Sequence, residues 1–226
     1  MDWGVHTHTS LGCSTGDLSQ KNRKIGLGAM GAPMASHLLR TFGSVNVYNR
    51  THAKTLWWCE QNIGSQAFDN LAELAKASDA VFLCIGNDDD VRHTIQTMLP
   101  HLKPASVIVD HTITSRALAQ EMATLCANHQ VSFLDCPVSG GQAGAQNGVL
   151  TIMAGGDEAT FERIHPFLQA FSKHQQYFGV SGNGQSVIKC VHKCLACDGE
   201  LGQAIGSQAV SDEDDEIAVV TGFECI

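Results

Sequence analysis

The sequence predicts an α/β fold in which helices cover both faces of a doubly wound, mostly parallel sheet. Two features carry this prediction. Short apolar segments alternate with segments of helical periodicity from Lys24 onward, and repeated β-then-α units assemble into parallel sheets with right-handed crossovers. A glycine-rich turn, GLGAMG, opens the first helical segment, as it does in folds that bind dinucleotides.

The expected strands share a nearly continuous apolar character, which is typical of strands buried on both faces. They cover residues 45–49, 80–86, 106–112, 132–138 and 150–156. Most of the expected helices have a residue near their start whose side-chain oxygen can cap the first turn. These helices cover residues 32–41, 53–62, 70–76, 89–102, 115–129 and 158–171, with Thr51, Asp69, Asp88, Thr114 and Asp157 as capping candidates.

The first strand is the weak element of this arrangement. A strand at the centre of the sheet should be apolar, but the segment SQKNRKIG offers only Ile25 before Gly26. We therefore expect either a short strand or one from which a few residues are missing.

The composition suits a soluble enzyme and argues against several other classes. With 226 residues, of which 43% are hydrophobic, the chain can bury a proper core. The formal charge of -9 owes much to the acidic run at residues 212–216, and the remainder argues against a nucleic-acid partner. We expect no membrane span and no secretory leader. Nine cysteines without paired spacing in most of the chain favour the reducing cytoplasm.

The glycine-rich turn places Gly26, Gly28 and Gly31 in the pattern G-x-G-x-x-G. The first glycine permits a tight turn, the second allows close approach to a pyrophosphate, and the third allows close packing of helix on strand. The helix that begins here directs its N–H groups and its positive dipole end at the phosphates.

The end of the second strand bears on the choice of cofactor. NAD-binding domains carry an acidic residue there for the ribose 2′-hydroxyl, whereas this chain has Asn49, Arg50 and Thr51. A guanidinium and a hydroxyl suit a 2′-phosphate. The sequence thus favours NADP, with NAD as the other possibility. An exposed arginine at the start of a helix is the alternative interpretation.

A second glycine-rich segment, LDCPVSGGQAGAQNG, follows the fourth of the strands described above. Ser139, Gly140 and Gly141 offer a hydroxyl and backbone N–H groups that can hold a carboxylate. A tight turn between two strands is the alternative.

With these motifs the sequence resembles the β-hydroxyacid dehydrogenase family, which includes 3-hydroxyisobutyrate dehydrogenase, tartronate semialdehyde reductase and, more distantly, 6-phosphogluconate dehydrogenase. The resemblance covers about residues 24–187. It rests on GLGAMGAPMASHLL, VYNRT, CIGNDDDV, VDHTITS, the segment from DCPVSGG to IHPFL, and GNGQSV.

The resemblance implies a Rossmann domain that binds NAD(P), followed by a helical domain that completes the substrate site and usually a homo-oligomer. It also implies a small substrate that bears a carboxylate, held by Ser139, Gly140 and Gly141. The residues that it places beside the cofactor are Gly26, Gly28, Ala29, Met30, Gly31, Asn49, Arg50, Thr51, Ile85, Gly86, Asn87 and Thr112.

The family uses a lysine as general acid and base beside the carbonyl that accepts hydride, with an asparagine one helical turn later. The family pattern G-x-G-x-x-x-K-x-x-x-N places Ile188 at the lysine position and His192 at the asparagine position. We take Lys189, one residue later, as the candidate. One residue of slip rotates a helical side chain by about 100°, so Lys189 reaches the site only if the loop absorbs an insertion.

We therefore divide the chain into an unrelated N-terminal extension at 1–22, the NAD(P)-binding domain at 23–183, and a truncated C-terminal segment at 184–226. We expect the family's helical domain to be essentially absent beyond Cys197, and its loss would affect catalysis and the homo-oligomer more than cofactor binding. Two functions stay open beside that of an active NADP-dependent reductase. One is a catalytically impaired NADP-binding domain, and the other is a metal site at Cys190, Cys194 and Cys197.

Overall fold

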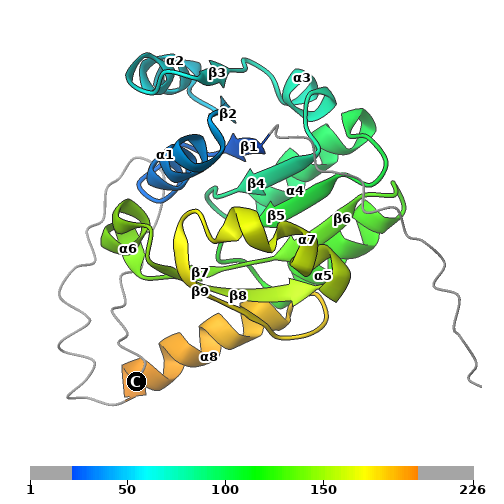
Figure 1. The fold of residues 1–226 in the computed structure, drawn as a ribbon. Helices are drawn as coiled ribbons and strands as arrows, with labels where there is room; N and C mark the ends of the chain where they lie inside the picture. Colours follow the sequence, from blue (N-terminus) through cyan, green and yellow to red (C-terminus); the bar gives the residue numbers. More distant parts are fainter. Residues whose placement is uncertain (1–21, 198–226) are drawn as a thin grey trace, which may run out of the picture.

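The computed structural model describes residues 22–197, with the side chains of residues 26–192, and has the doubly wound α/β architecture that the sequence predicts. The strands of this part of the chain lie in the order β3-β2-β1-β4-β5-β6-β8-β7, with β9 paired to β8 (Figure 1). Their bounds are β1 Asn22–Ile25, β2 Val45–Tyr48, β3 Ser65–Ala67, β4 Ala80–Leu83, β5 Val107–Asp110, β6 Ser132–Asp135, β7 Val138–Ser139, β8 Leu150–Gly156 and β9 Ser172–Tyr177.

The sheet is mostly parallel, with an antiparallel end. Strands β1 to β6 run parallel to one another, whereas β8 pairs antiparallel with both β6 and β7. The strand order reverses at β1, where β2 lies on one side and β4 on the other. A crevice outside the carboxyl ends of the strands forms at such a reversal. Strand β1 has 4 residues, as many as β2, β4, β5 and β6, and it lies between two hydrogen-bonded neighbours despite its polar sequence.

Helices cover both faces of the sheet (Figure 1). In β4, Phe82 packs into the core beneath α1 and α7, while Val81 and Leu83 pack into the core beneath α3, α4 and α5. This alternation lets both faces of one strand be buried. The bounds are α1 Gly31–Phe42, α2 His52–Gln61, α3 Leu71–Lys76, α4 Asp88–Met98, the 3-10 helix η1 Leu99–His101, α5 Arg116–Ala127, α6 Gly141–Asn147, α7 Glu158–Leu168 and α8 Asn183–Cys197.

Most of the expected helix caps differ from the observed ones by one residue. Asp157 caps α7 as expected, by accepting a hydrogen bond of 2.8 Å from the N–H of Thr160. Elsewhere consecutive polar residues compete for the position, and the neighbour of the expected residue takes it. The caps are Asn70 rather than Asp69, Asn87 rather than Asp88, and Ser115 rather than Thr114. Thr51 precedes α2 without a side-chain capping bond.

Three elements were missing from the sequence-based arrangement, namely β3, β9 and α6. Strand β9, SKHQQY, is polar because most of its residues are partly or fully exposed beside β8.

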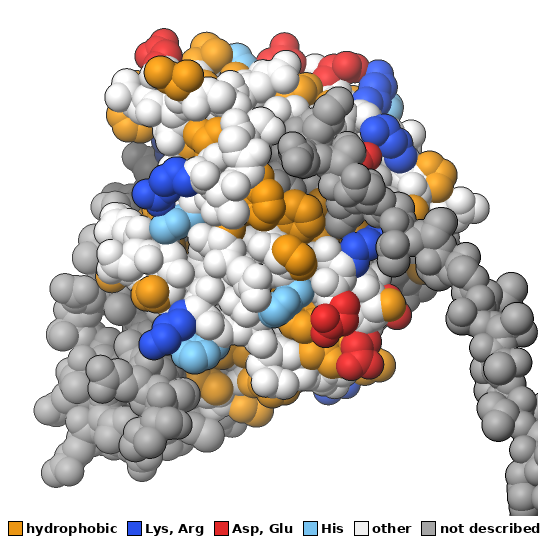
Figure 2. All heavy atoms as spheres, in the orientation of Figure 1, with side chains coloured by type: hydrophobic (Ala, Val, Ile, Leu, Met, Phe, Trp, Pro, Cys, Tyr) orange, Lys and Arg blue, Asp and Glu red, His pale blue; other side chains and the backbone are white. Residues whose placement is uncertain are grey.

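Charged side chains of both signs are interspersed over the face shown in Figure 2. Within residues 22–197, no helix combines the length and the apolarity that crossing a membrane requires. Asn22, expected to end the N-terminal extension, begins β1, while residues 1–21 and the acidic run at 212–216 lie outside the described residues.

Candidate functional site

A cavity of about 210 Å³ opens at the reversal of strand order. Its walls come from the glycine-rich turn after β1, the residues after β2, and the β4–α4 loop. The residues that the sequence placed beside a cofactor and that line this cavity are Gly26, Gly28, Asn49, Arg50, Thr51, Ile85 and Gly86. The fold therefore brings together segments that lie far apart in the sequence.

Gly26 makes the turn that forms the floor of the cavity. Its φ of +88° lies in the left-handed region, and its N–H donates a hydrogen bond of 3.0 Å to the carbonyl of Tyr48. A Cβ at this position would lie 2.0 Å from the carbonyl oxygen of Cys84. Glycine is required here because the turn passes directly over the end of β4.

The start of α1 is suited to an anion. Met30 occupies the N-cap position without a side-chain capping bond, and the first turn carries no acidic residue. The N–H of Ala32 donates to the carbonyl of Gly28 and Pro33 has no N–H, so the positive end of the helix dipole is what favours a negatively charged ligand here. Together with the glycine turn and the adjoining cavity, this fits the pyrophosphate of a dinucleotide.

Asn49 has a structural task in addition to the one expected from the sequence. Its Oδ1 accepts a hydrogen bond of 3.1 Å from the N–H of Leu27, so the end of β2 holds the glycine-rich turn. Arg50 and Thr51 are exposed at the cavity rim. Lys54 also lines the cavity and was missed by the sequence analysis. The signal was its position in the first turn of α2, directly after the loop that carries Arg50 and Thr51.

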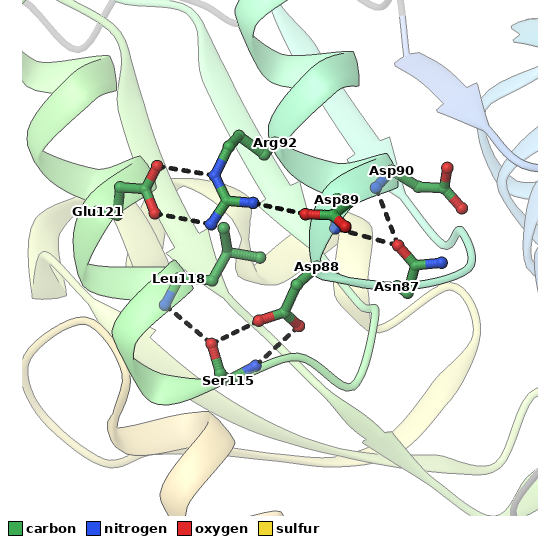
Figure 3. A network of polar contacts seen from close by, with 8 residues as sticks. All are labelled: Asn87, Asp88, Asp89, Asp90, Arg92, Ser115, Leu118 and Glu121. Carbon is green, nitrogen blue, oxygen red and sulfur yellow. Dashed lines mark hydrogen bonds and ion pairs between the residues drawn. The ribbon is translucent and has the colours of Figure 1, made fainter.

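The β4–α4 loop is held at both ends. The N–H of Ile85 donates to Thr112 Oγ1 at 3.2 Å, which joins two of the residues expected beside the cofactor. Asn87 Oδ1 accepts from the N–H groups of Asp89 and Asp90 at 3.0 and 3.1 Å (Figure 3). The start of α4 is therefore fixed relative to β5.

A network on the outer side of this loop reaches α5 (Figure 3). The carboxylate of Asp88 accepts from the N–H of Ser115 at 3.1 Å and from its hydroxyl at 2.5 Å, while Ser115 Oγ accepts from the N–H of Leu118. Arg92 donates to both carboxylate oxygens of Glu121 at 2.9 Å. The hydrogen bond to the Glu121 carboxylate raises the pKa of Arg92, and the same bond lowers the pKa of Glu121.

The second glycine-rich segment forms the start of a helix rather than a tight turn. Ser139 ends β7 and is buried, and α6 begins at Gly141. Gly140 and Gly141 have φ values of +123° and +57°. The first of these conformations is open essentially to glycine alone, so this backbone path depends on its sequence.

A buried carboxylate, Asp135, holds the start of α8 and was not identified from the sequence. It accepts hydrogen bonds from the N–H groups of Gly182 at 2.7 Å and Gln185 at 3.0 Å. Burial raises the pKa of Asp135, and the hydrogen bonds from these backbone groups oppose the rise. A Cβ at Gly184 would lie 2.4 Å from the carbonyl oxygen of Met153, so the helix packs directly on β8.

The side chain of Gln185 links the start of α8 to the segment after β5, which includes Thr112, a residue expected beside the cofactor. Its Nε2 donates to the carbonyl of Thr112 at 2.7 Å, and its Oε1 accepts from the N–H of Thr114 at 2.9 Å. The register of α8 is thereby fixed, with Ile188 fully buried and Lys189 exposed. Lys189 lies four residues after Gln185 and therefore on the same side of the helix, one turn further on.

The cysteines of the proposed metal site are only partly described. Cys190 is exposed, while the side chains of Cys194 and Cys197 lie outside the described part of the structure. Among the side chains that are described, no group of three His, Cys, Asp or Glu residues could hold a metal ion. Burial lowers the pKa of His192, at the family's asparagine position.

The fold and the cavity together define a dinucleotide-binding domain of the Rossmann type. Residues 24–190 match the family model of the NAD binding domain of 6-phosphogluconate dehydrogenase. The chain belongs to this family, and the predicted membership of the β-hydroxyacid dehydrogenases is confirmed. A nicotinamide dinucleotide is therefore the cofactor of this domain.

Relatives of known sequence support this assignment. The chain is 43% identical over 175 residues to an uncharacterized oxidoreductase of Shewanella frigidimarina, a match that covers 76% of this chain and 60% of the relative. It is 38% identical over 165 residues to a probable mitochondrial 3-hydroxyisobutyrate dehydrogenase-like protein of Arabidopsis thaliana, with 71% and 48% of the two chains covered. The chain thus spans about half to three fifths of the length of these relatives.

Solved structures have the same fold. Mycobacterium tuberculosis 3-hydroxyisobutyrate dehydrogenase with L-serine aligns with a TM-score of 0.74 and 28% identity, and the match covers 84% of this chain and 67% of the other. Psf3 in complex with NADP+ and 2-OPP aligns with a TM-score of 0.73 and 25% identity over 84% and 69% of the two chains.

Proposed function

We propose that this protein is an NADP-dependent oxidoreductase that interconverts a small β-hydroxyacid and its semialdehyde. The observation that carries the proposal is the cavity at the strand reversal, where the glycine turn and uncapped α1 meet a basic rim. A nicotinamide dinucleotide held there would exchange a hydride with the substrate carbon. The cytoplasm is the compartment that we propose, because the described cysteines are free thiols.

The preference for NADP is supported by the chemistry of the rim. Arg50 and Lys54 supply two cations and Thr51 a hydroxyl on one side of the cavity. Asn49, which ends β2, replaces the acidic residue that would repel a 2′-phosphate. Guanidinium and ammonium groups bind phosphate through charge-assisted hydrogen bonds. The relative Psf3, whose structure contains NADP+, supports the same choice.

For the substrate we propose a carboxylate bound at Ser139, Gly140 and Gly141. The two glycines have positive φ values at the start of α6, and backbone N–H groups in such conformations can form an anion-binding nest. Lys189 is the proposed proton donor for the carbonyl oxygen that becomes a hydroxyl. An ammonium group supplies that proton and stabilises the developing negative charge.

A second candidate function is NADP binding with impaired turnover. It is favoured by the burial of Ile188 at the position where the family pattern places its lysine. The hydrogen bonds of Asp135 and Gln185 at the start of α8 support this register, in which Ile188 stands at the lysine position. A metal role for Cys190, Cys194 and Cys197 stays a minor alternative, and quantitative metal analysis of the purified chain tests it.

NADPH oxidation separates the first two functions. We would follow the absorbance of NADPH with succinic, tartronic and methylmalonic semialdehydes, and measure NADPH binding separately by fluorescence titration. Turnover that falls by about 100-fold or more in Lys189→Ala with unchanged NADPH binding supports an active enzyme, since general acid–base groups contribute 10²–10⁴-fold. Lys173→Ala is the matched control, because Lys173 is an exposed lysine on β9.

The outcomes are distinct. Tight NADPH binding with no turnover of any semialdehyde favours the impaired domain over the active enzyme. Turnover that survives in Lys189→Ala removes Lys189 from the mechanism. Failure of the unmodified chain to bind either NADPH or NADH overturns both functions.

A further inference from the structure

Asp90 lies opposite the basic rim of the cofactor cavity. Its Oδ1 is 3.6 Å from Nη1 of Arg50, and both residues line the cavity. Arg50 follows β2, whereas Asp90 belongs to the first turn of α4, so the ion pair joins two walls. The Asp90 side chain is 38% exposed, so its charge is only partly screened by water.

The position of this carboxylate is fixed by the β4–α4 loop. The N–H of Asp90 donates to Asn87 Oδ1 at 3.1 Å. A Cβ at Gly86 would lie 2.6 Å from Asp90 Oδ2, so the carboxylate packs against the glycine backbone. In Figure 3 the Asp90 side chain points away from Arg92, whereas that of Asp89 points toward it. Asp89 and Asp90 are therefore neighbours in sequence with different surroundings.

The location of Asp90 bears on which cofactor the cavity accepts. In this type of fold a carboxylate at the end of the second strand binds the ribose 2′-hydroxyl, and a cation there accommodates a 2′-phosphate. This chain has the cation, Arg50, at the end of β2, and a carboxylate on the facing helix. A 2′-phosphate at Arg50 would meet a negative charge and would compete with Asp90 for the guanidinium. A free 2′-hydroxyl would find an acceptor instead.

We propose that Asp90 is a specificity-determining residue, which weakens binding of the 2′-phosphorylated dinucleotide and retains binding of the unphosphorylated one. The inference rests on the proposed function, because it requires a nicotinamide dinucleotide in this cavity. Asp90 pairs with Arg50 when the phosphate is absent and opposes the phosphate when it is present. The two residues together set a moderate NADP preference rather than an absolute one.

The test is a direct binding measurement on the full 226-residue chain. NADPH and NADH are titrated by isothermal calorimetry into the unmodified protein and into Asp90→Asn. A partly exposed charge pair changes affinity by about two- to fivefold. We expect the Kd for NADPH to fall by this factor in Asp90→Asn, while the Kd for NADH stays constant or rises. The ratio of the Kd for NADH to the Kd for NADPH therefore increases.

Asp89→Asn is the matched control, because Asp89 lies one position earlier in the same helical turn and pairs with Arg92 at 2.9 Å. Asp89→Asn also removes one negative charge from the first turn of α4, but it does not alter the residues that line the cavity. Asp90→Asn is also made in the background of Arg50→Ala, where removal of the pairing cation should diminish its effect. Asp90→Ser serves as a second substitution, with circular dichroism to verify folding.

The inference is overturned if Asp90→Asn changes the NADH-to-NADPH ratio of Kd values no more than Asp89→Asn does. That result leaves the proposed function intact as long as the unmodified chain binds one of the cofactors. If the unmodified chain binds neither NADPH nor NADH, the proposed function fails and the inference fails with it.

Discussion

Replacing Asp135 by Asn tests how the start of α8 is anchored. The carboxylate is fully buried and accepts from the backbone N–H groups of Gly182 and Gln185. An amide of the same size has one oxygen, so one of these N–H groups would face the amide nitrogen. The loss of a hydrogen bond to a charged acceptor costs about 1.5–3 kcal/mol. The substitution also removes a buried charge, and the desolvation cost that this saves offsets part of the free energy lost with the hydrogen bond.

We expect a net loss of about 2 kcal/mol in the free energy of unfolding, because the orphaned N–H stays buried. For a domain of this size, that corresponds to a fall of about 4–8 °C in Tm. Urea unfolding at pH 7, followed by circular dichroism, measures the free energy directly. Asp157→Asn is the control, because Asn caps a helix as well as Asp does and the exposed start of α7 should lose only a few tenths of a kcal/mol.

The pH dependence gives a second measurement on the same variant. Burial raises the pKa of Asp135 above its ordinary value of 3.8. The folded protein therefore binds this proton more tightly than the unfolded chain does, and the contribution of Asp135 to stability grows as pH falls through the folded pKa. Asp135→Asn lacks this titration. The gap in unfolding free energy between the two proteins should widen below neutrality and level off below the unfolded pKa.

The reasoning is refuted if Asp135→Asn unfolds within about 0.5 kcal/mol of the unmodified protein at pH 7, which is the ordinary range for surface substitutions. A gap that narrows on acidification would contradict the direction of the pKa shift. In either case the register of α8 would have to be held by Gln185 and by helix packing alone.

Two further substitutions test the cofactor loops. Gly26→Ala should raise the Kd for NADPH at least about tenfold, because the new Cβ would lie 2.0 Å from the Cys84 carbonyl oxygen and displace the turn. Gly43→Ala is the control, since Gly43 also has a positive φ but its added Cβ would meet nothing within 4 Å, and NADPH binding should not change. Ser115→Ala removes the cap of α5 and the bond to Asp88, so unfolding should become easier by about 1–2 kcal/mol. Urea denaturation measures this, and a change below about 0.3 kcal/mol would mean that the network in Figure 3 does not stabilise the domain.

The architecture was predictable because its signals are local and repeated. Apolar segments such as 80–86 and 150–156 gave strands at the expected places, observed as β4 and β8. Strand β9 was not predictable in the same way, since its six residues, SKHQQY, lack apolar alternation and pair with β8 through the backbone. Helix caps were ambiguous by one residue wherever polar side chains followed one another, as at Asn87 and Asp88.

The cofactor cavity was predictable in large part, because the glycine pattern and the residues after β2 are close to each other in sequence. Asp90, which reaches the same cavity from α4, carries no local signal of this role. Asp135 and Gln185 are harder still, since they make their contacts over sequence separations of 47 and more residues. Polar residues with such distant partners are recognised only once the chain is folded.

The anchor formed by Asp135 and Gln185 also separates two parts of the molecule that can change independently. Within residues 22–197, all the residues that line the cofactor cavity precede Gln185 in sequence, and the bonds of Gln185 to Thr112 and Thr114 are buried. A residue added after this point rotates the later part of α8 without moving the cofactor loops. A change at the proposed proton donor, Lys189, is therefore expected to leave the nucleotide site intact, so that ligand affinity and turnover vary separately among chains with this helix.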